Sequence, residues 1–142
     1  MYKFSQRSYN TLKGIHPDLI TVLVTAIQNS PYDFTLTNGV RTTSEQQELY
    51  SKGRSQPGPK VTYTDGIKNK SNHQLKEDSF GYAVDLYPYF EGAVQVQGEE
   101  VAKRLTAIAQ HIIQTGKKLN IMIEWGGNWK SFKDTPHFEL KK

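Results

Sequence analysis

Apolar residues recur at helical spacing in two segments of the chain. The first segment is HPDLITVLVTAIQNS, residues 16–30, in which Pro17 suits the first helical turn. The second is EEVAKRLTAIAQHIIQTGKKL, residues 99–119, in which Gly116 lies near the end. The apolar positions that would share one face are Leu19, Val22, Leu23, Ala26 and Ile27 in the first segment and Val101, Leu105, Ile108 and Ile112 in the second. Each segment therefore predicts an amphipathic helix.

A third, more polar helix is predicted from the residues at its ends. In TSEQQELYSKG, residues 43–53, Ser44 is the expected N-cap because Gln47 follows it at capping-box spacing. Gly53 is expected to end this helix, since glycine adopts the left-handed conformation that commonly follows a helix.

Four shorter segments predict strands. Phe34 and Leu36 alternate with polar residues, and the Asn38-Gly39 pair after them is typical of a turn or a bulge. The other three are GYAVDLYPY at residues 81–89, NIMIEWGG at residues 120–127 with a Gly-Gly turn at its end, and TPHFEL at residues 135–140, entered through Pro136. Residues 53–72 are rich in Gly, Pro, Ser and Lys, which predicts a long loop with a short strand at residues 60–64.

These elements together predict a small α+β fold in which about three helices pack against one mostly antiparallel sheet. The chain has 142 residues, 36% of them hydrophobic, which suffices for one core, and it contains no repeat and no linker. We expect residues 1–142 to form a single domain and the protein to be a monomer.

Composition and charge exclude several kinds of site. The sequence has no cysteine, so thiolate zinc ligands, disulfides and cysteine nucleophiles are excluded, and any metal must be held by histidine and carboxylate. Lys and Arg outnumber Asp and Glu by 18 to 14, but the basic residues look scattered, so we expect a solvated surface and no nucleic-acid partner. The N-terminus lacks an apolar run of signal-peptide length, and no segment approaches the roughly 20 apolar residues of a membrane span. We therefore expect synthesis in the cytoplasm without a signal peptide.

Asp85 is a charged residue in the middle of an otherwise apolar strand, between Val84 and Leu86. An unpaired carboxylate inside a packed sheet costs several kcal/mol. Either a cation holds Asp85, or this face of the strand is exposed to water.

The four histidines fall into two pairs. His16 lies beside a helix start and His111 lies on the last helix, so both are expected to be structural or surface residues. His73 follows the polar loop, and His137 opens the last strand, where Glu139 shares its face.

Two imidazoles and one carboxylate form a common catalytic zinc site, because three protein ligands leave a fourth position open. His73, Asp85 and His137 are therefore candidate zinc ligands, and the ion would compensate the charge of Asp85. In the alternative interpretation, Asp85 pairs with Arg41 and both histidines are ordinary polar residues.

Two further residues are candidates for catalysis. Asp134 lies three residues before His137 and could act as a general base without being a ligand. Arg41, at the end of the first strand, could polarise a carbonyl or stabilise an oxyanion, or it could be a surface arginine near a helix start. The HExxH zinc motif is absent, so the ligands must come from separate strands and loops.

Four segments carry a resemblance to a known family. GVRTTSEQQELYSKGRS, VTYTDGIKNKSNH, GYAVDLYP and WGGNWKSFKDTPHFEL together resemble the LAS-type zinc peptidases of the M15 family, and the subgroup of phage and bacterial L-alanyl-D-glutamate endopeptidases, including phage endolysins, in particular. The resemblance covers residues 31–140 and follows a motif of Ser-x-His, then Gly-x-Ala-x-Asp, then a late His. The matching positions are Ser71, His73, Gly81, Ala83, Asp85 and His137.

The resemblance implies a function. It implies that His73, Asp85 and His137 ligate zinc, that Asp134 is the general base and that Arg41 stabilises the transition state. It implies a peptidoglycan stem peptide as substrate, cut between L-alanine and D-glutamate. A D,D-carboxypeptidase or dipeptidase of the same family is an alternative, and so is a non-catalytic, zinc-stabilised module that binds the envelope or nucleic acid. We expect no separate wall-binding domain, and action on the cell wall after release, in the host periplasm if the chain is phage-encoded.

One departure from the family pattern lies next to the candidate site. Seven residues, 74–80, separate His73 from Gly81 where the usual pattern has two. This insertion offers Glu77 or Asp78 as rival ligands, or it shapes access to the substrate. Trp125 and Trp129 bracket the Gly-Gly turn and are expected to cap the core rather than to line a cleft for the stem peptide.

Overall fold

An antiparallel sheet forms the centre of the structure, a computed structural model that describes residues 1–131 and 133–142. Residue 132, within the last of the four family-like segments, lies outside the described residues. The strands are β1 (Phe34–Asn38), β2 (Ala83–Phe90), β3 (Ala93–Val94), β4 (Ile123–Trp125) and β5 (His137–Leu140). Their order is β1-β2-β5-β4, β3 also pairs with β2, and every pairing is antiparallel. The predicted α+β fold is confirmed.

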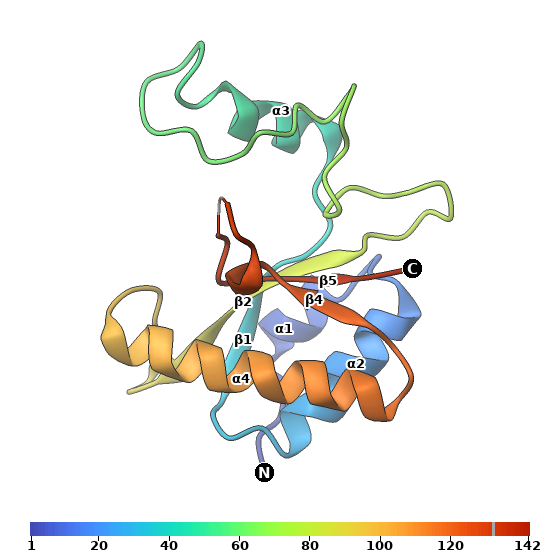
Figure 1. Ribbon diagram of the computed structural model, residues 1–142, viewed down its shortest axis with the longest axis vertical. Helices are drawn as coiled ribbons and strands as arrows, with labels where there is room; N and C mark the ends of the chain where they lie inside the picture. The colour runs from blue at the N-terminus through green and yellow to red at the C-terminus, as the bar shows by residue number, and fades with distance from the viewer. Residues whose placement is uncertain (132) are drawn as a thin grey trace.

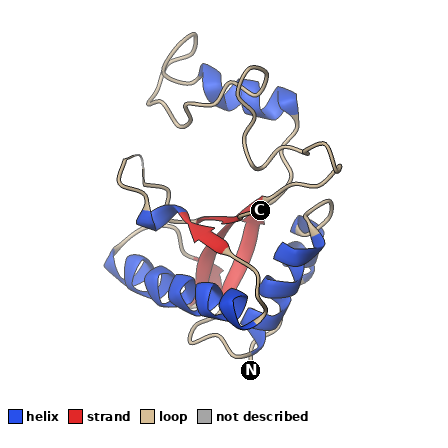
Figure 2. Cartoon of the chain, turned by 45° about the vertical axis from the view of Figure 1, so that its right-hand side comes forward, coloured by secondary structure: helices blue, strands red, loops and turns tan. Residues whose placement is uncertain are grey.

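Two long helices cover one face of the sheet. The helices are α1 (Gln6–Thr11), α2 (Pro17–Gln28), α3 (Thr43–Ser51) and α4 (Glu99–Lys118), with a 3-10 turn η1 (Gly126–Asn128). α2 and α4 contact each other and the sheet, and lie on the same side of it in both views (Figures 1 and 2). All nine apolar positions predicted for these helices are buried, which confirms both predictions. In the described part of the chain, no helix combines the length and the apolar character needed to cross a membrane.

Alternation along β2 and β5 separates an apolar face from a polar one. Val84 and Phe138 are paired across the two strands and are fully buried in the core. Their neighbours Asp85 and His137 are also paired, and they point to the opposite face, where they line a pocket. Asp85 thus lies in an apolar strand without entering the core.

An irregularity in β1 adds a third side chain to this polar face. Leu36 pairs with Leu86, but the next pair joins Asn38 to Asp85, so β1 has one residue more than β2 between these pairs. The sequence predicted a turn or bulge at Asn38-Gly39, and the structure has the bulge at this end of β1. As a result, Asn38 faces Asp85.

α3 and the loop after it form a lobe that lies away from α2 and α4 (Figures 1 and 2). The N-cap is Thr42, whose hydroxyl accepts from the Glu45 amide at 3.0 Å while the Glu45 carboxylate accepts from the Thr42 amide at 2.9 Å. The prediction of Ser44 was wrong because this segment contains overlapping capping-box spacings, and Glu45 supplies a charged acceptor at one of them. Gly53 follows the helix with φ of +78°, as predicted.

Two further expectations need correction, and one helix was not predicted. Residues 60–64 form no strand, because polar groups there bond to the side chain of Gln46 instead of to a ladder. The described residues contain the three predicted helices and also α1, which lacks apolar periodicity and depends on the cap at Ser5 and on the buried Ser8 hydroxyl. Arg41 lies beyond β1, in the loop before α3, and does not end the strand.

Candidate metal centre

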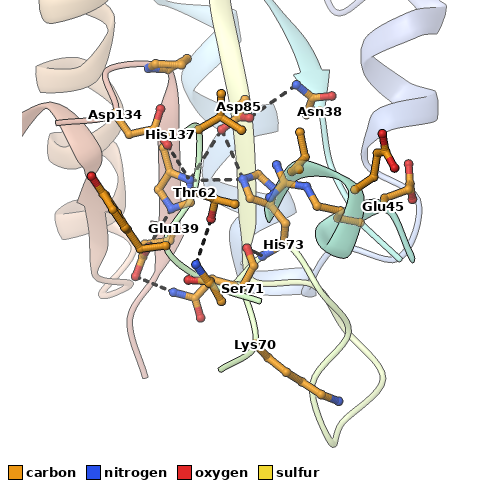
Figure 3. Close-up of a pocket in the computed structure, with 18 of the residues that line it drawn as sticks. Asn38, Glu45, Thr62, Lys70, Ser71, His73, Asp85, Asp134, His137 and Glu139 are labelled. Carbon is orange, nitrogen blue, oxygen red and sulfur yellow. Dashed lines mark hydrogen bonds and ion pairs between the residues drawn. The ribbon is translucent and has the colours of Figure 1, made fainter. Parts of the chain in front are cut away.

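His73, Asp85 and His137 converge on one point at the polar face of the sheet (Figure 3). His73 Nε2 lies 3.3 Å and His137 Nδ1 lies 3.6 Å from Asp85 Oδ1. The two imidazole nitrogens are 3.2 Å apart. Both histidines are buried, so the three atoms face one another with little access to water.

The other nitrogen of each imidazole has a fixed partner. His73 Nδ1 lies 3.0 Å from the Gly39 carbonyl oxygen, which can only accept a hydrogen bond. His137 Nε2 lies 2.7 Å from Glu139 Oε1, a buried carboxylate oxygen. Each of these nitrogens therefore donates, and the neutral imidazoles direct lone pairs from His73 Nε2 and His137 Nδ1 toward the common point.

This arrangement fits a bound cation. Asp85 Oδ1 is buried and accepts no hydrogen bond from any residue that the structure describes. Three electron-pair donors that face one another repel unless a positive charge lies between them. Tetrahedral ligand bonds of about 2.0–2.1 Å correspond to ligand separations of about 3.3 Å, close to those observed. The three predicted residues could therefore hold a metal ion.

Electrostatics of the metal-free chain agree with this geometry. Burial alone would raise the pKa of Asp85, but contacts with the imidazoles of His137 and His73 outweigh burial and hold that pKa well below its usual value. Burial alone would lower the pKa of His137, but Asp85 and Glu139 raise it to about 9. Without a metal, His137 thus carries the positive charge that the site requires.

Asp134 lies beside the three converging residues without joining them. Its Oδ2 is 3.9 Å from His137 Nδ1. Burial and the negative charge of Asp85 raise its pKa. Its backbone is held by Gly126, whose carbonyl accepts from the Asp134 amide at 3.1 Å. A Cβ on Gly126 would lie 2.2 Å from the Asp134 carbonyl oxygen, so only glycine permits this approach.

Arg41 lies on the wall of the same pocket, but it does not pair with Asp85. Its Nη1 donates to Gln46 Oε1 at 2.7 Å, and its backbone amide donates to the His73 carbonyl at 2.8 Å. Burial lowers the pKa of the guanidinium, whereas the charges of Asp85 and Asp134 act in the opposite direction. The ion pair between Arg41 and Asp85 in the alternative interpretation is therefore not found among the described residues.

Comparison with known proteins adds the family. The family model described as phage L-alanyl-D-glutamate peptidase matches residues 1–141. The chain belongs to this family. The L-alanyl-D-glutamate peptidase of Escherichia phage T5 is 29% identical over 143 residues, which cover 99% of this chain and 90% of that protein. The peptidoglycan L-alanyl-D-glutamate endopeptidase CwlK of Bacillus subtilis is 33% identical over 118 residues, which cover 83% of this chain and 66% of CwlK.

A solved structure supports the same assignment. The crystal structure of the Serratia marcescens L-Ala D-Glu endopeptidase ChiX matches with a TM-score of 0.78 and 30% sequence identity. The match covers 98% of this chain and 90% of ChiX. The similarity in fold therefore agrees with the family assigned from the sequence.

The insertion at residues 74–80 does not separate the three converging residues of this family member. The Lys76 amide donates to the Phe80 carbonyl at 2.9 Å, and the Tyr82 amide donates to the Asn72 carbonyl at 2.8 Å, so the excursion returns to where it began. The rival ligands Glu77 and Asp78 are exposed and lie outside the group of converging residues. The prediction of these rivals is therefore not supported by the geometry.

The remaining predicted residues have identifiable contacts. His16 Nδ1 accepts from the Asp18 amide at 3.0 Å as the N-cap of α2, and His111 Nε2 lies 2.9 Å from the Ala26 carbonyl oxygen. Both are structural, as predicted. Trp125 is buried against Phe138, as expected for a residue that caps the core. Trp129 instead lines the pocket, with its ring 5.1 Å from that of His137.

A pocket of about 660 Å³ connects the metal centre to the α3 lobe. One wall is the polar face of the sheet, and the other includes Arg41, Glu45 and residues 61–64. Sequence reasoning missed two of the polar contacts that position this wall and the site, namely those of Gln46 and Asn38. The signal for Asn38 was the bulge expected after Leu36, whereas no sequence pattern marked Gln46, which is buried only in the folded structure.

Proposed function

We propose that this protein is a zinc-dependent endopeptidase that hydrolyses the bond between L-alanine and D-glutamate in peptidoglycan stem peptides. The observation that carries the proposal is the buried Asp85 Oδ1, which accepts no hydrogen bond from any described residue and lies 3.3 Å from His73 Nε2 and 3.6 Å from His137 Nδ1. The relatives that are named for this activity, from phage T5 and Bacillus subtilis, support the substrate.

The ligands in this proposal are His73 through Nε2, His137 through Nδ1 and Asp85 through Oδ1. Zinc suits two imidazoles and a carboxylate, and when bound it supplies a Lewis acid that polarises a carbonyl group and lowers the pKa of water. Gly39 and Glu139 hold the two imidazoles in the tautomers that this binding needs.

Two residues beside the ligands, Asp134 and Arg41, have separate roles in amide hydrolysis in this proposal. Asp134 accepts a proton from the attacking water while the water oxygen bonds to the scissile carbonyl carbon. It then gives this proton to the leaving amine when the C–N bond breaks. The raised pKa of Asp134 suits both transfers. Arg41 stabilises the negative charge that develops on the carbonyl oxygen. Gln46 orients the guanidinium and, being neutral, leaves its charge available.

The deciding experiment is digestion of purified peptidoglycan with analysis of the fragments by mass spectrometry. The proposal predicts new L-alanine carboxyl and D-glutamate amino ends, loss of cleavage after chelation, and recovery on addition of zinc. Release of a terminal D-alanine instead would identify a D,D-carboxypeptidase. Intact fragments from a folded, zinc-loaded protein would indicate a non-catalytic module.

We further propose that residues 1–142 act as one catalytic domain, that the protein is a monomer, and that it reaches its substrate after release from the cytoplasm. Sedimentation of the zinc-loaded protein tests the monomer, because a dimer would double the measured mass. Addition of the purified protein to permeabilised cells, with cleavage of the cell wall as the readout, tests whether the protein reaches the wall.

A further inference from the structure

The positive charge of this protein is concentrated in one segment. Residues 52–76 contain six basic side chains and one acidic one, Asp65, so the segment has a formal charge of +5. The other 117 residues contain 12 basic and 13 acidic side chains and have a formal charge of −1. The basic residues of the segment are Lys52, Arg54, Lys60, Lys68, Lys70 and Lys76, and all six are exposed. The expectation of scattered basic charge is therefore incomplete.

This basic segment borders the pocket of the metal centre. Residues 61–64 and Lys70 line the pocket on the side of the α3 lobe. Figure 3 shows Lys70 on the loop that leads to Ser71 and His73, directed away from the metal centre. The segment is far from α4, which lies beyond the sheet (Figures 1 and 2).

Buried amides fix the basic segment to the rest of the lobe. The fully buried Gln46 donates from Nε2 to the Thr64 carbonyl at 2.6 Å. Gln74, a buried residue of the segment itself, donates to the Thr43 hydroxyl at the start of α3 at 3.3 Å. Its bonds to the Gly66 carbonyl and the Ser71 amide hold the segment together internally. The exposed charges are thus carried on a backbone that is attached at several points.

The basic side chains of this segment are only partly offset by nearby carboxylates. Lys68 interacts electrostatically with Asp65, and Glu77 and Asp78 line one small pocket together with Lys70 and Lys76. None of the five lysines forms an ion pair with a carboxylate among residues 1–131 and 133–142. Arg54 lies over the ring of Tyr50 at 3.7 Å and donates to the carbonyl groups of Tyr50 and Thr62, and it forms no ion pair with a carboxylate in the described part of the chain. A surface of this kind attracts an anionic partner, because exposed positive charge outnumbers negative charge within the segment.

We propose that the basic segment is a docking surface for the carboxylates of polymeric peptidoglycan. This inference rests on the proposed function, since a glutamate that is linked through one carboxyl group retains the other. Each stem peptide in the polymer therefore presents a carboxylate near the bond to be cut. The basic segment holds neighbouring stems of the polymer while one stem occupies the pocket, and so raises the local concentration of substrate.

The test compares two triple variants of equal charge. Lys52→Gln, Lys60→Gln and Lys68→Gln change the basic segment outside the pocket, and Lys103→Gln, Lys117→Gln and Lys118→Gln change the exposed face of α4. Binding to sedimented peptidoglycan is measured in an Asp134→Ala background to prevent digestion. We expect the first triple variant to bind at least about tenfold more weakly at low salt, since each lysine near an anionic surface contributes roughly fivefold, with the difference disappearing at high salt.

The α4 triple variant should bind like the parent. If both triple variants bind more weakly to the same extent, net charge alone explains binding and the docking surface is overturned. Unchanged binding of the first triple variant would also overturn the docking surface. The parent protein should not bind to peptidoglycan whose carboxylates have been amidated. It should bind as before to peptidoglycan from which phosphate polymers have been removed with hydrofluoric acid. The opposite pattern would identify phosphate as the ligand and overturn the assignment to carboxylates.

A soluble L-alanyl-D-glutamyl peptide separates this inference from the proposed function. With Asp134 restored, the first triple variant should cleave the soluble peptide at the parent rate and digest polymeric peptidoglycan more slowly. Failure of the parent protein itself to cleave the soluble peptide would contradict the proposed function, whatever the binding results.

Discussion

Asp85 and His137 are direct cross-strand partners in the register of β2 and β5. On the other side of β2, Asn38 pairs with Asp85 and donates to its Oδ2 at 3.4 Å. One row across three strands thus contains two candidate ligands and a side chain that orients one of them. A slip of one residue in either pairing would turn the slipped strand's side chain into the core, so the register of the sheet specifies the candidate metal centre.

Replacement of Asp134 by alanine should separate catalysis from metal binding. We expect kcat to fall by about 10²–10⁴-fold because the proton acceptor is lost. The zinc content should stay near that of the parent, because Asp134 is not among the three converging residues. Kinetics on a soluble stem peptide and elemental analysis of the same preparation measure both quantities. A variant that retains the parent rate would show that another group is the base.

Glu139→Gln should weaken zinc binding through His137. The neutral amide accepts the hydrogen bond of His137 Nε2 less strongly, and it can also rotate to favour the wrong tautomer. We expect a 10–100-fold loss of zinc affinity, which is typical for such partners, in competition with a chromophoric chelator.

A matched control for this change is Glu124→Gln. Glu124 pairs with Glu139 across β4 and β5 and also contacts Lys141, but it makes no contact with His137 among the described residues. Its substitution should leave zinc affinity unchanged. Equal affinities in both variants would mean that Glu139 does not orient the imidazole.

Gln46→Leu should misplace Arg41 while leaving the metal site intact. The change removes the acceptor at 2.7 Å from Arg41 Nη1 and the donors to Thr62 and Thr64. We expect kcat to fall by roughly 10–100-fold from lost orientation, and stability to fall by about 1–3 kcal/mol from unpaired buried groups. Single-turnover kinetics, thermal unfolding and zinc content measure these effects.

The neighbouring position supplies the control for Gln46. Gln47 lies on the same helix but is exposed, so Gln47→Leu should leave kcat, stability and zinc content close to the parent values. If the two leucine variants behave alike, the hydrogen bond between Gln46 and Arg41 does not contribute to catalysis.

The metal-free protein should lose stability as pH rises from about 6.5 to 9. The pKa of His137 is raised from 6.5 to about 9 in the folded state, so the folded chain binds more protons than the unfolded chain in this range. The contribution is complete below pH 6.5, is lost as pH rises through 9, and amounts to about 3 kcal/mol. Urea unfolding of the chelated protein at several pH values measures it.

Two variants of that experiment test its cause. His137→Gln should remove the decline between pH 6.5 and 9, because the titrating group is absent. Saturation with zinc should also suppress it, because the metal then occupies the place of the proton. A decline that persists in the glutamine variant would assign the effect to another group.

Periodicity and motif spacing predicted much of this fold from the sequence. α2 and α4 follow from apolar residues that the core does bury, and the strand at Asp85 follows from its β-branched and aromatic neighbours. Two imidazoles and a carboxylate made the three converging residues candidates, and the family motif that they match selected them although they are distant in sequence.

Other features depend on contacts that no local pattern encodes. α1 is a polar helix of six residues. The Leu36 amide donates a hydrogen bond to the Ser8 hydroxyl, so this helix depends on a partner strand 28 residues away. The role of Gln46 depends on the path of the loop that folds over it. Three overlapping spacings compete for the cap of α3, and the sequence alone did not favour Thr42 over Ser44.

Residues 74–80 leave the path of the chain and return to it, so they lengthen the sequence between the candidate ligands His73 and Asp85 without moving the two residues apart in space. The tip of this excursion is exposed at Glu77, and backbone bonds between Lys76 and Phe80 seal its base. A few glycines inserted after Glu77 should therefore leave zinc affinity unaltered. The same tip offers an attachment point for a fluorescent reporter, through which the arrival of the enzyme at intact cell walls could be followed in real time.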